Sequence, residues 1–287
     1  MYFGLRAHDF GPCGDLPGSA EVLAERIASY GVSSIQLALS KAFPDFPARP
    51  GLLSPGFARG IREAFSARGL AIAVLGCYIN PIHPDQATRE LQLSRFKEHL
   101  RFARDFGCSI VGTETGSLNP DSSFHPDTET EEAFDTLCFS LERLVKTAER
   151  CGSIVGIEPV ADQHSVSSIE KAAALLSRID SPALGIIFDP VNLLPRIGLK
   201  ESQAKFFQRS FTAFGSRVVA VHVKDFRFEN GKKNVAFAPG SGEFDFPAFF
   251  SLLQSSKPGI DVLLENTSPT TAPAALDFLR RVAANTA

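Results

Sequence analysis

Short apolar runs rich in β-branched residues alternate with longer segments of helical periodicity along the 287-residue chain. The apolar runs are nearly free of polar positions, which is typical of strands buried on both faces of a parallel sheet. They predict eight strands, at residues 2–7, 34–39, 71–77, 109–113, 154–158, 184–189, 218–224 and 261–265.

The helical segments fall between and after these strands. We expect helices at residues 19–30, 55–68, 84–106, 129–151, 167–179, 200–214, 246–254 and 272–284. Four of them are followed at once by glycine (31, 69, 107 and 152), the residue that helix C-termini prefer. A strict alternation of strands and helices implies parallel strands joined by right-handed crossovers.

Eight strand–helix units in one domain's length favour a closed barrel over an open, doubly wound sheet. Such (β/α)8 barrels take about 250 residues, so we expect a single TIM-barrel domain over residues 1–287. An open sheet would show a glycine-rich phosphate turn after its first strand, but residues 8–14 read HDFGPCG. The longest predicted loops, 40–54, 117–128 and 226–243, follow strands and are therefore expected at the active-site end of the barrel.

An ionisable residue ends each of the last four predicted strands: Glu158, Asp189, His222 and Glu265. Taken singly, each is compatible with an ordinary polar residue satisfied by lysine, arginine or backbone groups. In a barrel all four meet at one end, where buried carboxylates are costly and repel one another unless a cation joins them. Three oxygens and one imidazole nitrogen suit one divalent ion. Mn²⁺ is our first choice, with Mg²⁺, Co²⁺ and Zn²⁺ as alternatives.

The segments around these residues resemble the xylose-isomerase-like superfamily of TIM barrels. The resemblance rests on residues 156–159 (GIEP), 188–192 (FDPVN), 222–225 (HVKD), 264–266 (LEN) and 239–246 (PGSGEFDF). It implies a metal-dependent isomerase or epimerase of a sugar, sugar phosphate or related polyol ketone, acting through a metal-stabilised enediolate. In the ketose 3-epimerase branch, Glu158 and Glu265 would also be the catalytic acid and base.

Five further polar residues are expected to bind substrate: His8, His83, Glu114, Asn192 and Lys224. The first three follow predicted strands. Asn192 stands where epimerases of that branch often carry a histidine. Lys224 shares a strand face with His222, so it would steady a substrate oxygen, neutralise the carboxylates or form a structural ion pair.

Three other functions compete with the isomerase reading. A keto-inositol dehydratase would use the same metal and base. An apurinic-site endonuclease would need three metals and more histidines, and Asn192 removes one expected ligand. A non-catalytic sugar-binding barrel would not need the complete ligand set.

The net charge is −3, with 29 basic and 32 acidic residues and no basic run, so we expect no nucleic-acid partner. The five cysteines are odd in number and form no C-x-x-C pair, which indicates free thiols in a reducing cytosol. We find no signal-like leader or membrane-spanning run. We therefore expect a cytoplasmic enzyme with a small carbohydrate substrate and no membrane partner, with a homo-oligomer as an open possibility.

Four smaller expectations complete the sequence reading. Cys77 is expected to pack in the core and His99 to lie on a helix surface. Residues 239–242 are expected to form a structural turn rather than a phosphate cradle. His125 and His164 receive no role.

Overall fold

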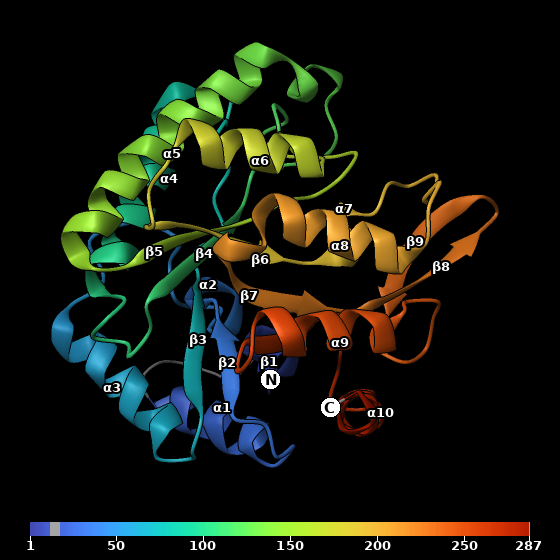
Figure 1. The fold of residues 1–287 in the computed structure, drawn as a ribbon. Helices are drawn as coiled ribbons and strands as arrows, with labels where there is room; N and C mark the ends of the chain where they lie inside the picture. Colours follow the sequence, from blue (N-terminus) through green and yellow to red (C-terminus); the bar gives the residue numbers. More distant parts are fainter. Residues whose placement is uncertain (12–17, 287) are drawn as a thin grey trace.

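Eight parallel strands close into a barrel with helices around it, as Figure 1 shows for the computed structural model, which describes residues 1–11 and 18–286. This confirms the predicted (β/α)8 fold, and each strand lies within two residues of its predicted bounds. In order round the barrel the strands are β1 (Tyr2–Arg6), β10 (Asp261–Leu264), β7 (Val218–Val223), β6 (Leu184–Phe188), β5 (Ile154–Glu158), β4 (Ile110–Glu114), β3 (Ala71–Gly76) and β2 (Ser34–Leu37).

The main helices are α1 (Gly18–Ala28), α3 (Pro55–Ser66), α4 (Gln86–Phe102), α5 (Glu131–Cys151), α6 (Ile169–Arg178), α8 (Gln203–Phe214), α9 (Phe246–Ser256) and α10 (Ala272–Asn285). Short helical turns are η1 (Ala7–Phe10), α2 (Leu39–Ala42), η2 (Pro126–Glu129), α7 (Pro190–Leu193) and η3 (Gly215–Arg217). The four glycines expected after helices all adopt positive φ, between 64° and 74°. Glycine takes that conformation without strain. Of these four helices α5 ends directly at its glycine, Gly152, whereas the other three end a few residues before theirs.

The prediction of an irregular loop at 226–243 is wrong, because this segment contains an antiparallel hairpin of β8 (Asp225–Glu229) and β9 (Lys232–Phe237). Figure 1 shows the hairpin projecting beyond the barrel after β7. Its turn is Asn230-Gly231, with φ of 52° and 72°. Both residues have the positive φ that a type I′ hairpin turn needs, so the sequence did contain a hairpin signal.

Apolar side chains fill the barrel interior. Val74, Ile187, Ala220 and Leu263, from β3, β6, β7 and β10, form a buried cluster there. Gly112 and Gly156 make room for it, since a Cβ on either would lie under 3.0 Å from the Ile187 side chain. The interior is thus packed rather than open, and polar side chains collect at the carboxyl ends of the strands.

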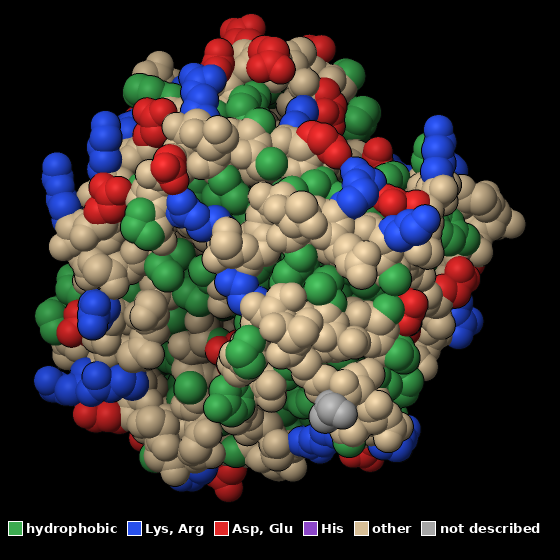
Figure 2. Space-filling view, viewed as in Figure 1, with side chains coloured by type: hydrophobic (Ala, Val, Ile, Leu, Met, Phe, Trp, Pro, Cys, Tyr) green, Lys and Arg blue, Asp and Glu red, His purple; other side chains and the backbone are tan. Residues whose placement is uncertain are grey.

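A larger apolar layer lies between the barrel and the helices. Phenylalanine supplies much of it, with 25 residues in a chain that has no tryptophan. Phe188 of β6, for example, packs edge-on against Phe214 of α8 and Phe249 of α9. Acidic and basic side chains are interspersed on the face shown in Figure 2. In the described part of the chain, no helix has the length and apolarity needed to cross a membrane.

Candidate metal centre

The four strand-end residues come together at one end of the barrel. Glu158 ends β5, Asp189 follows β6, His222 lies in β7, and Glu265 follows β10. Each offers one ligand atom, and these atoms all lie within 4.8 Å of one another. All four residues are buried, with at most 4% of their surface exposed. The predicted convergence of these side chains is therefore present in the structure.

His222 faces two carboxylates with one ring nitrogen. Its Nδ1 lies 3.2 Å from Oε2 of Glu158 and 3.1 Å from Oε1 of Glu265. Neither contact has hydrogen-bond geometry, so Nδ1 is a buried nitrogen with no hydrogen-bond partner. The other ring nitrogen, Nε2, lies 2.5 Å from Oε1 of Gln36.

Two cations flank the carboxylates. Lys224 Nζ lies 2.9 Å from Oδ2 of Asp189 and donates to Oε2 of Glu265 at 2.8 Å. Arg6 donates to Oε1 of Glu265 at 2.7 Å and also pairs with both oxygens of Asp9. With Asp9, the cluster holds four carboxylates against two permanent cations. Two negative charges remain when all four carboxylates are ionised and His222 is neutral.

The two glutamates have opposite electrostatic surroundings. Burial raises the pKa of Glu158, and the charge of Glu265 adds to this effect while His222 opposes it. Burial alone would also raise the pKa of Glu265, but Lys224, Arg6 and His222 outweigh it and hold that pKa well below its usual range. For His222, burial lowers the pKa, yet Glu158 and Glu265 raise it to about 10.

These residues fit a divalent metal. A first-row ion lies about 2.1 Å from each ligand, so a modest contraction of the four atoms would surround it. Its charge would equal the two uncompensated negative charges of the cluster. It would also give the buried Nδ1 of His222 the partner that this nitrogen lacks. The donor set of three carboxylates and one imidazole suits hard to borderline metals.

Two of the predicted substrate-binding residues touch the ligands directly. Asn192 donates from Nδ2 to Oε1 of Glu158 at 2.6 Å, and its backbone N–H donates to Oδ1 of Asp189. Lys224 is held by Asp189 and Glu265 and is 4% exposed. Of its three predicted roles, the contacts favour neutralisation of the carboxylates.

Glu114 and His8 lie near the candidate metal centre, and the contacts described for them do not include the four candidate ligands. Glu114 ends β4 opposite Glu158 in the strand register, and its carboxylate is 3.7 Å from Nε2 of the buried His164. His8 lies in η1 with Nε2 3.8 Å from Asp9. Burial, followed by the positive charges of Arg6 and Lys41, lowers the pKa of His8 to about 3.

His83 makes local contacts. Its Nδ1 accepts the backbone N–H of Asp85 at 3.1 Å, and its carbonyl accepts Arg89. His125 has a similar local role, since its Nδ1 accepts the N–H of Asp127. The structure thus gives both side chains a part in helix starts, at α4 and η2.

The sequence reading missed two residues of the site, Arg6 and Gln36. Both are polar positions in largely apolar strands, and Gln36 is 2% exposed. A polar group in a strand buried on both faces must find a partner inside the barrel. The cost of burying an unpaired polar group therefore indicated that each of these residues has a partner. The pattern of a single strand does not show which residue across the barrel that partner is.

A polar cavity of about 470 Å³ opens beside Tyr78, at the same end of the barrel. Its charged lining includes Lys41, Arg95 and Glu114. The amine of Lys41 lies 3.6 Å from the centre of the Tyr78 ring. Tyr78 accepts a hydrogen bond from Gln36, which contacts His222, so the cavity adjoins the metal centre through two residues.

The glycine-rich turn at 239–242 encloses a carboxylate of the chain itself. Oδ2 of Asp225 accepts the backbone N–H groups of Gly240 and Gly242 at 3.0 and 2.8 Å. A Cβ at Gly242 would lie 2.3 Å from the carbonyl of Phe226. These amides are therefore occupied by the protein's own carboxylate rather than open to a phosphate, which agrees with the expected structural turn.

The expectation for His99 is wrong, since this residue is 5% exposed rather than on the surface. Its Nδ1 contacts the carbonyl of Arg95, and its ring pairs with the buried thiol of Cys77. Cys77, Cys108, Cys138 and Cys151 are free thiols, as predicted, and Cys13 lies outside the described residues.

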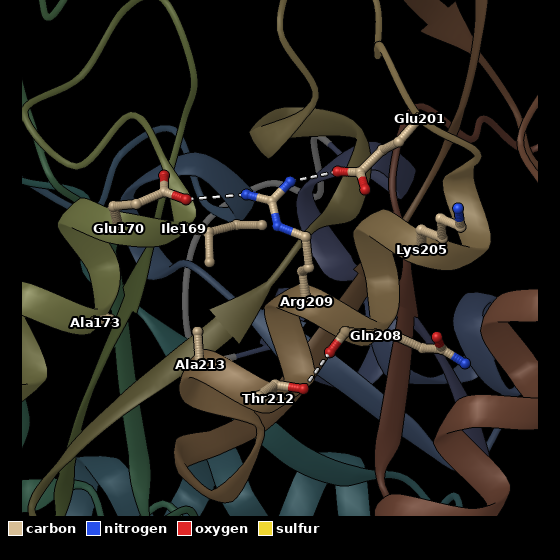
Figure 3. A pocket seen from close by; sticks show the side chains of 9 residues that line it. All are labelled: Ile169, Glu170, Ala173, Glu201, Lys205, Gln208, Arg209, Thr212 and Ala213. Carbon is tan, nitrogen blue, oxygen red and sulfur yellow. Dashed lines mark hydrogen bonds and ion pairs between the residues drawn. The ribbon is translucent and has the colours of Figure 1, made fainter.

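A second hollow of about 540 Å³ lies on the outside of the barrel, between α6 and α8. Figure 3 shows Arg209 reaching across it to Glu170 and Glu201, so its one central cation is already paired. None of the four candidate ligands lines it. The cavity beside Tyr78 is therefore the better candidate for the substrate.

Comparison with known proteins bears on the family and the fold. The model of a family described as "xylose isomerase-like TIM barrel" matches residues 24–282. The curated 3-oxo-isoapionate decarboxylase of Pectobacterium atrosepticum is 30% identical over 106 residues. That match covers 35% of this chain and 36% of the relative, so the chain matches about a third of the relative's length.

Solved structures of the same shape cover nearly the whole chain. D-psicose 3-epimerase from Clostridium cellulolyticum H10, solved with D-tagatose, superposes with a TM-score of 0.72 at 13% identity, over 99% of both chains. A xylose isomerase-like TIM barrel protein from Mycobacterium smegmatis, in complex with magnesium, gives 0.74 at 18% identity, over 100% of this chain and 97% of that one. At these identities the likeness concerns the fold.

Proposed function

The chain belongs to the xylose isomerase-like TIM barrel family, and on that premise we propose that it is a metal-dependent isomerase or epimerase. It would move a proton at the carbon beside the carbonyl group of a sugar or related polyol ketone. The observation that carries this proposal is the buried convergence of Glu158, Asp189, His222 and Glu265, which leaves two negative charges uncompensated when the carboxylates are ionised and His222 is neutral. A bound divalent ion would supply a Lewis acid that polarises the substrate carbonyl.

The contacts of the two glutamates suggest different roles. Both oxygens of Glu265 are engaged by cations, Oε1 by Arg6 and Oε2 by Lys224. Glu158 accepts a hydrogen bond from one neutral donor, Asn192, on Oε1, and its Oε2 lies 3.2 Å from Nδ1 of His222 without a lysine or arginine partner among the described residues. We therefore assign proton transfer to Oε2 of Glu158 and charge-holding to Glu265. This divides the acid–base pair that the family resemblance implies. One carboxylate is enough for an isomerisation on one face of the substrate, whereas an epimerisation would also need Glu265 to deliver a proton to the opposite face.

The cavity beside Tyr78 is the proposed place for the rest of the substrate. Its volume of about 470 Å³ is within the range of small-molecule sites. Lys41, Arg95 and Glu114 supply charged donors and an acceptor for hydroxyl or anionic groups. Glu114 would thus contact substrate from the strand next to that of Glu158.

Decarboxylation of a keto sugar acid is the second candidate, and the curated decarboxylase relative favours it. In that reaction the bond from carbon to the carboxylate breaks, CO₂ leaves, and its electron pair forms an enolate. One proton must then be delivered to carbon. A site with one proton-carrying carboxylate, Glu158, meets this need without a second base.

One experiment separates these reactions. The protein with Mn²⁺ would be incubated in D₂O with D-tagatose, a keto-inositol or a 3-oxo sugar acid, and followed by ¹H NMR. Isomerase or epimerase action predicts deuterium at the carbon beside the carbonyl in a product that keeps all its carbon and oxygen atoms. CO₂ release would favour the decarboxylase, and an unsaturated dicarbonyl product would favour a dehydratase.

The variant Glu158→Gln tests the assignment of the proton carrier. We expect at least a hundredfold loss of turnover, in line with loss of a general acid or base, while the exposed control Glu132→Gln stays active. Full activity in Glu158→Gln would contradict the role. A protein that binds Mn²⁺ but acts on none of these three classes would contradict the proposed function.

A further inference from the structure

A buried carboxamide lies between the proposed metal centre and the substrate cavity. Gln36 belongs to β2, whereas His222 belongs to β7, and β1 and β10 separate these strands round the barrel. The contact between Oε1 of Gln36 and Nε2 of His222, at 2.5 Å, therefore crosses the barrel interior. The Nε2 amide group of Gln36 donates to the hydroxyl of Tyr78 at 2.7 Å.

The chemistry of these groups determines which nitrogen of His222 carries a proton. A carboxamide oxygen only accepts hydrogen bonds, so the ring nitrogen that faces it must be N–H. In its neutral, metal-binding form His222 then keeps the proton on Nε2, and the lone pair of Nδ1 is the one offered to a cation. Nδ1 is the nitrogen that lies among the carboxylates of Glu158 and Glu265.

The opposite orientation of the carboxamide would work against metal binding. It would place the NH₂ group of Gln36 against Nε2 of His222, which would then have to accept. Nδ1 would carry the proton, and an N–H would point into the space between the carboxylates. A metal needs a lone pair there, because the neutral imidazole is the ligand.

We propose that Gln36 is a positioning residue that makes Nδ1 of His222 the metal-binding nitrogen, and that the hydroxyl of Tyr78 supports it by accepting from the amide group of Gln36. Tyr78 also lines the substrate cavity. Because Gln36 donates to the phenol oxygen of Tyr78, the phenol O–H can still donate a hydrogen bond to an acceptor in the substrate cavity. The hydrogen bonds between Tyr78 and Gln36 and between Gln36 and His222 thus connect the cavity to the proposed metal ligand.

The inference rests on the metal site of the proposed function, and its test uses metal binding rather than turnover. Mn²⁺ affinity would be measured by calorimetry for the wild type and three variants. Gln36→Met keeps the size of the side chain but removes the acceptor, and we expect Kd to rise 10- to 100-fold, as for loss of an outer-shell partner. Gln36→Glu retains an acceptor, so we expect its Kd within about threefold of the wild type. Tyr78→Phe keeps the ring, and we expect an intermediate loss.

A spectroscopic measurement tests the same point without a substitution. In the Zn²⁺-loaded protein, ¹H–¹⁵N correlation spectra should show His222 protonated on Nε2 and bound through Nδ1. Binding through Nε2 would overturn the inference even if the Gln36 variants failed to fold.

Other outcomes separate this inference from the proposed function. Equal affinity in the wild type and Gln36→Met, or equal losses in Gln36→Met and Gln36→Glu, would overturn the role of Gln36 alone. A wild-type protein that binds no divalent ion would instead overturn the proposed metal site. Thermal unfolding in EDTA would confirm that the variants being compared are folded.

Discussion

Arg6 on the first strand donates to Glu265 at the end of the last strand, with 2.7 Å between Nη1 and Oε1. The strands pair in parallel with Leu5 opposite Leu264, so the two residues are the next positions beyond that pair. The seam where the barrel closes therefore carries an ion pair at the end where the candidate ligands gather. As a result, the position of Glu265, one of these candidate ligands, depends on both ends of the chain.

Removal of the metal should destabilise the protein. A ligand that binds only the folded state adds about 2.7 kcal/mol at a hundred times its Kd, so the melting temperature should rise with Mn²⁺ concentration and fall in EDTA. Differential scanning calorimetry measures both. Asp189→Asn should lose the Mn²⁺ response, whereas the exposed Asp277→Asn should keep it. An unchanged response in Asp189→Asn would exclude Asp189 as a ligand.

Loss of Lys224 should weaken the metal-free protein more than the metal-bound one. Lys224→Met removes the cation between Asp189 and Glu265 and leaves buried carboxylates without a partner. Breaking such a pair costs about 3–5 kcal/mol, and a bound divalent ion would offset part of it. Urea unfolding with EDTA and with Mn²⁺ should therefore show a larger metal effect in Lys224→Met than in the exposed control Lys205→Met. A smaller gain in stability from Mn²⁺ in Lys224→Met than in Lys205→Met would contradict this prediction and would mean that Lys224 assists metal binding.

Sequence reasoning was most successful where a strand's apolar run ends in a polar residue. Glu158, Asp189, His222 and Glu265 were found because each stands at such an end and the barrel topology brings strand ends together. The bounds of the eight strands followed from the same pattern. Each strand end is visible in a short stretch of sequence, and the closed barrel then brings these ends together.

The features that the sequence did not predict depend mainly on contacts with distant parts of the chain, which the pattern of a single strand or helix does not reveal. Gln36 and Arg6 lie inside strands, and the side chains they contact come from β7 and from the residue after β10. His99 is buried where its ring contacts Cys77, the residue that follows β3. The periodicity of its own helix does not predict that contact. The hairpin after β7 is partly exposed on its strands, so no apolar run marked it.

Acid should destabilise the fold partly through His8. Its pKa is lowered to about 3, first by burial and then by Arg6 and Lys41, while Glu265 opposes the shift. Since the unfolded chain takes up this proton near pH 6.5, the stability present above pH 6.5 is lost as the pH falls from there toward 3. The slope due to this one group is at most about 1.4 kcal/mol per pH unit.

Urea unfolding in EDTA between pH 7.5 and 4.5 would measure this contribution, with the metal absent throughout. His8→Gln cannot take up a proton, so its stability should fall less steeply over this range than that of the wild type. Parallel curves for the two proteins would show that His8 is not the group responsible.

Loss of the Asp225 carboxylate should release the turn at 239–242 without disturbing the metal centre. Asp225 is 1% exposed and accepts four backbone N–H groups, from Phe226 and Phe244 on Oδ1 and from Gly240 and Gly242 on Oδ2. Asp225→Asn keeps the size of the side chain but turns one acceptor into a donor that faces N–H groups. Since a hydrogen bond to a charged group contributes about 1.5–3 kcal/mol, we expect the free energy of unfolding in urea to fall by at least that amount.

The exposed Glu229→Gln is the control for this variant. The Kd of Asp225→Asn for Mn²⁺ should stay near the wild-type value, because the four proposed ligands keep their contacts. A large loss of Mn²⁺ affinity with little loss of stability would instead place Asp225 in the metal site.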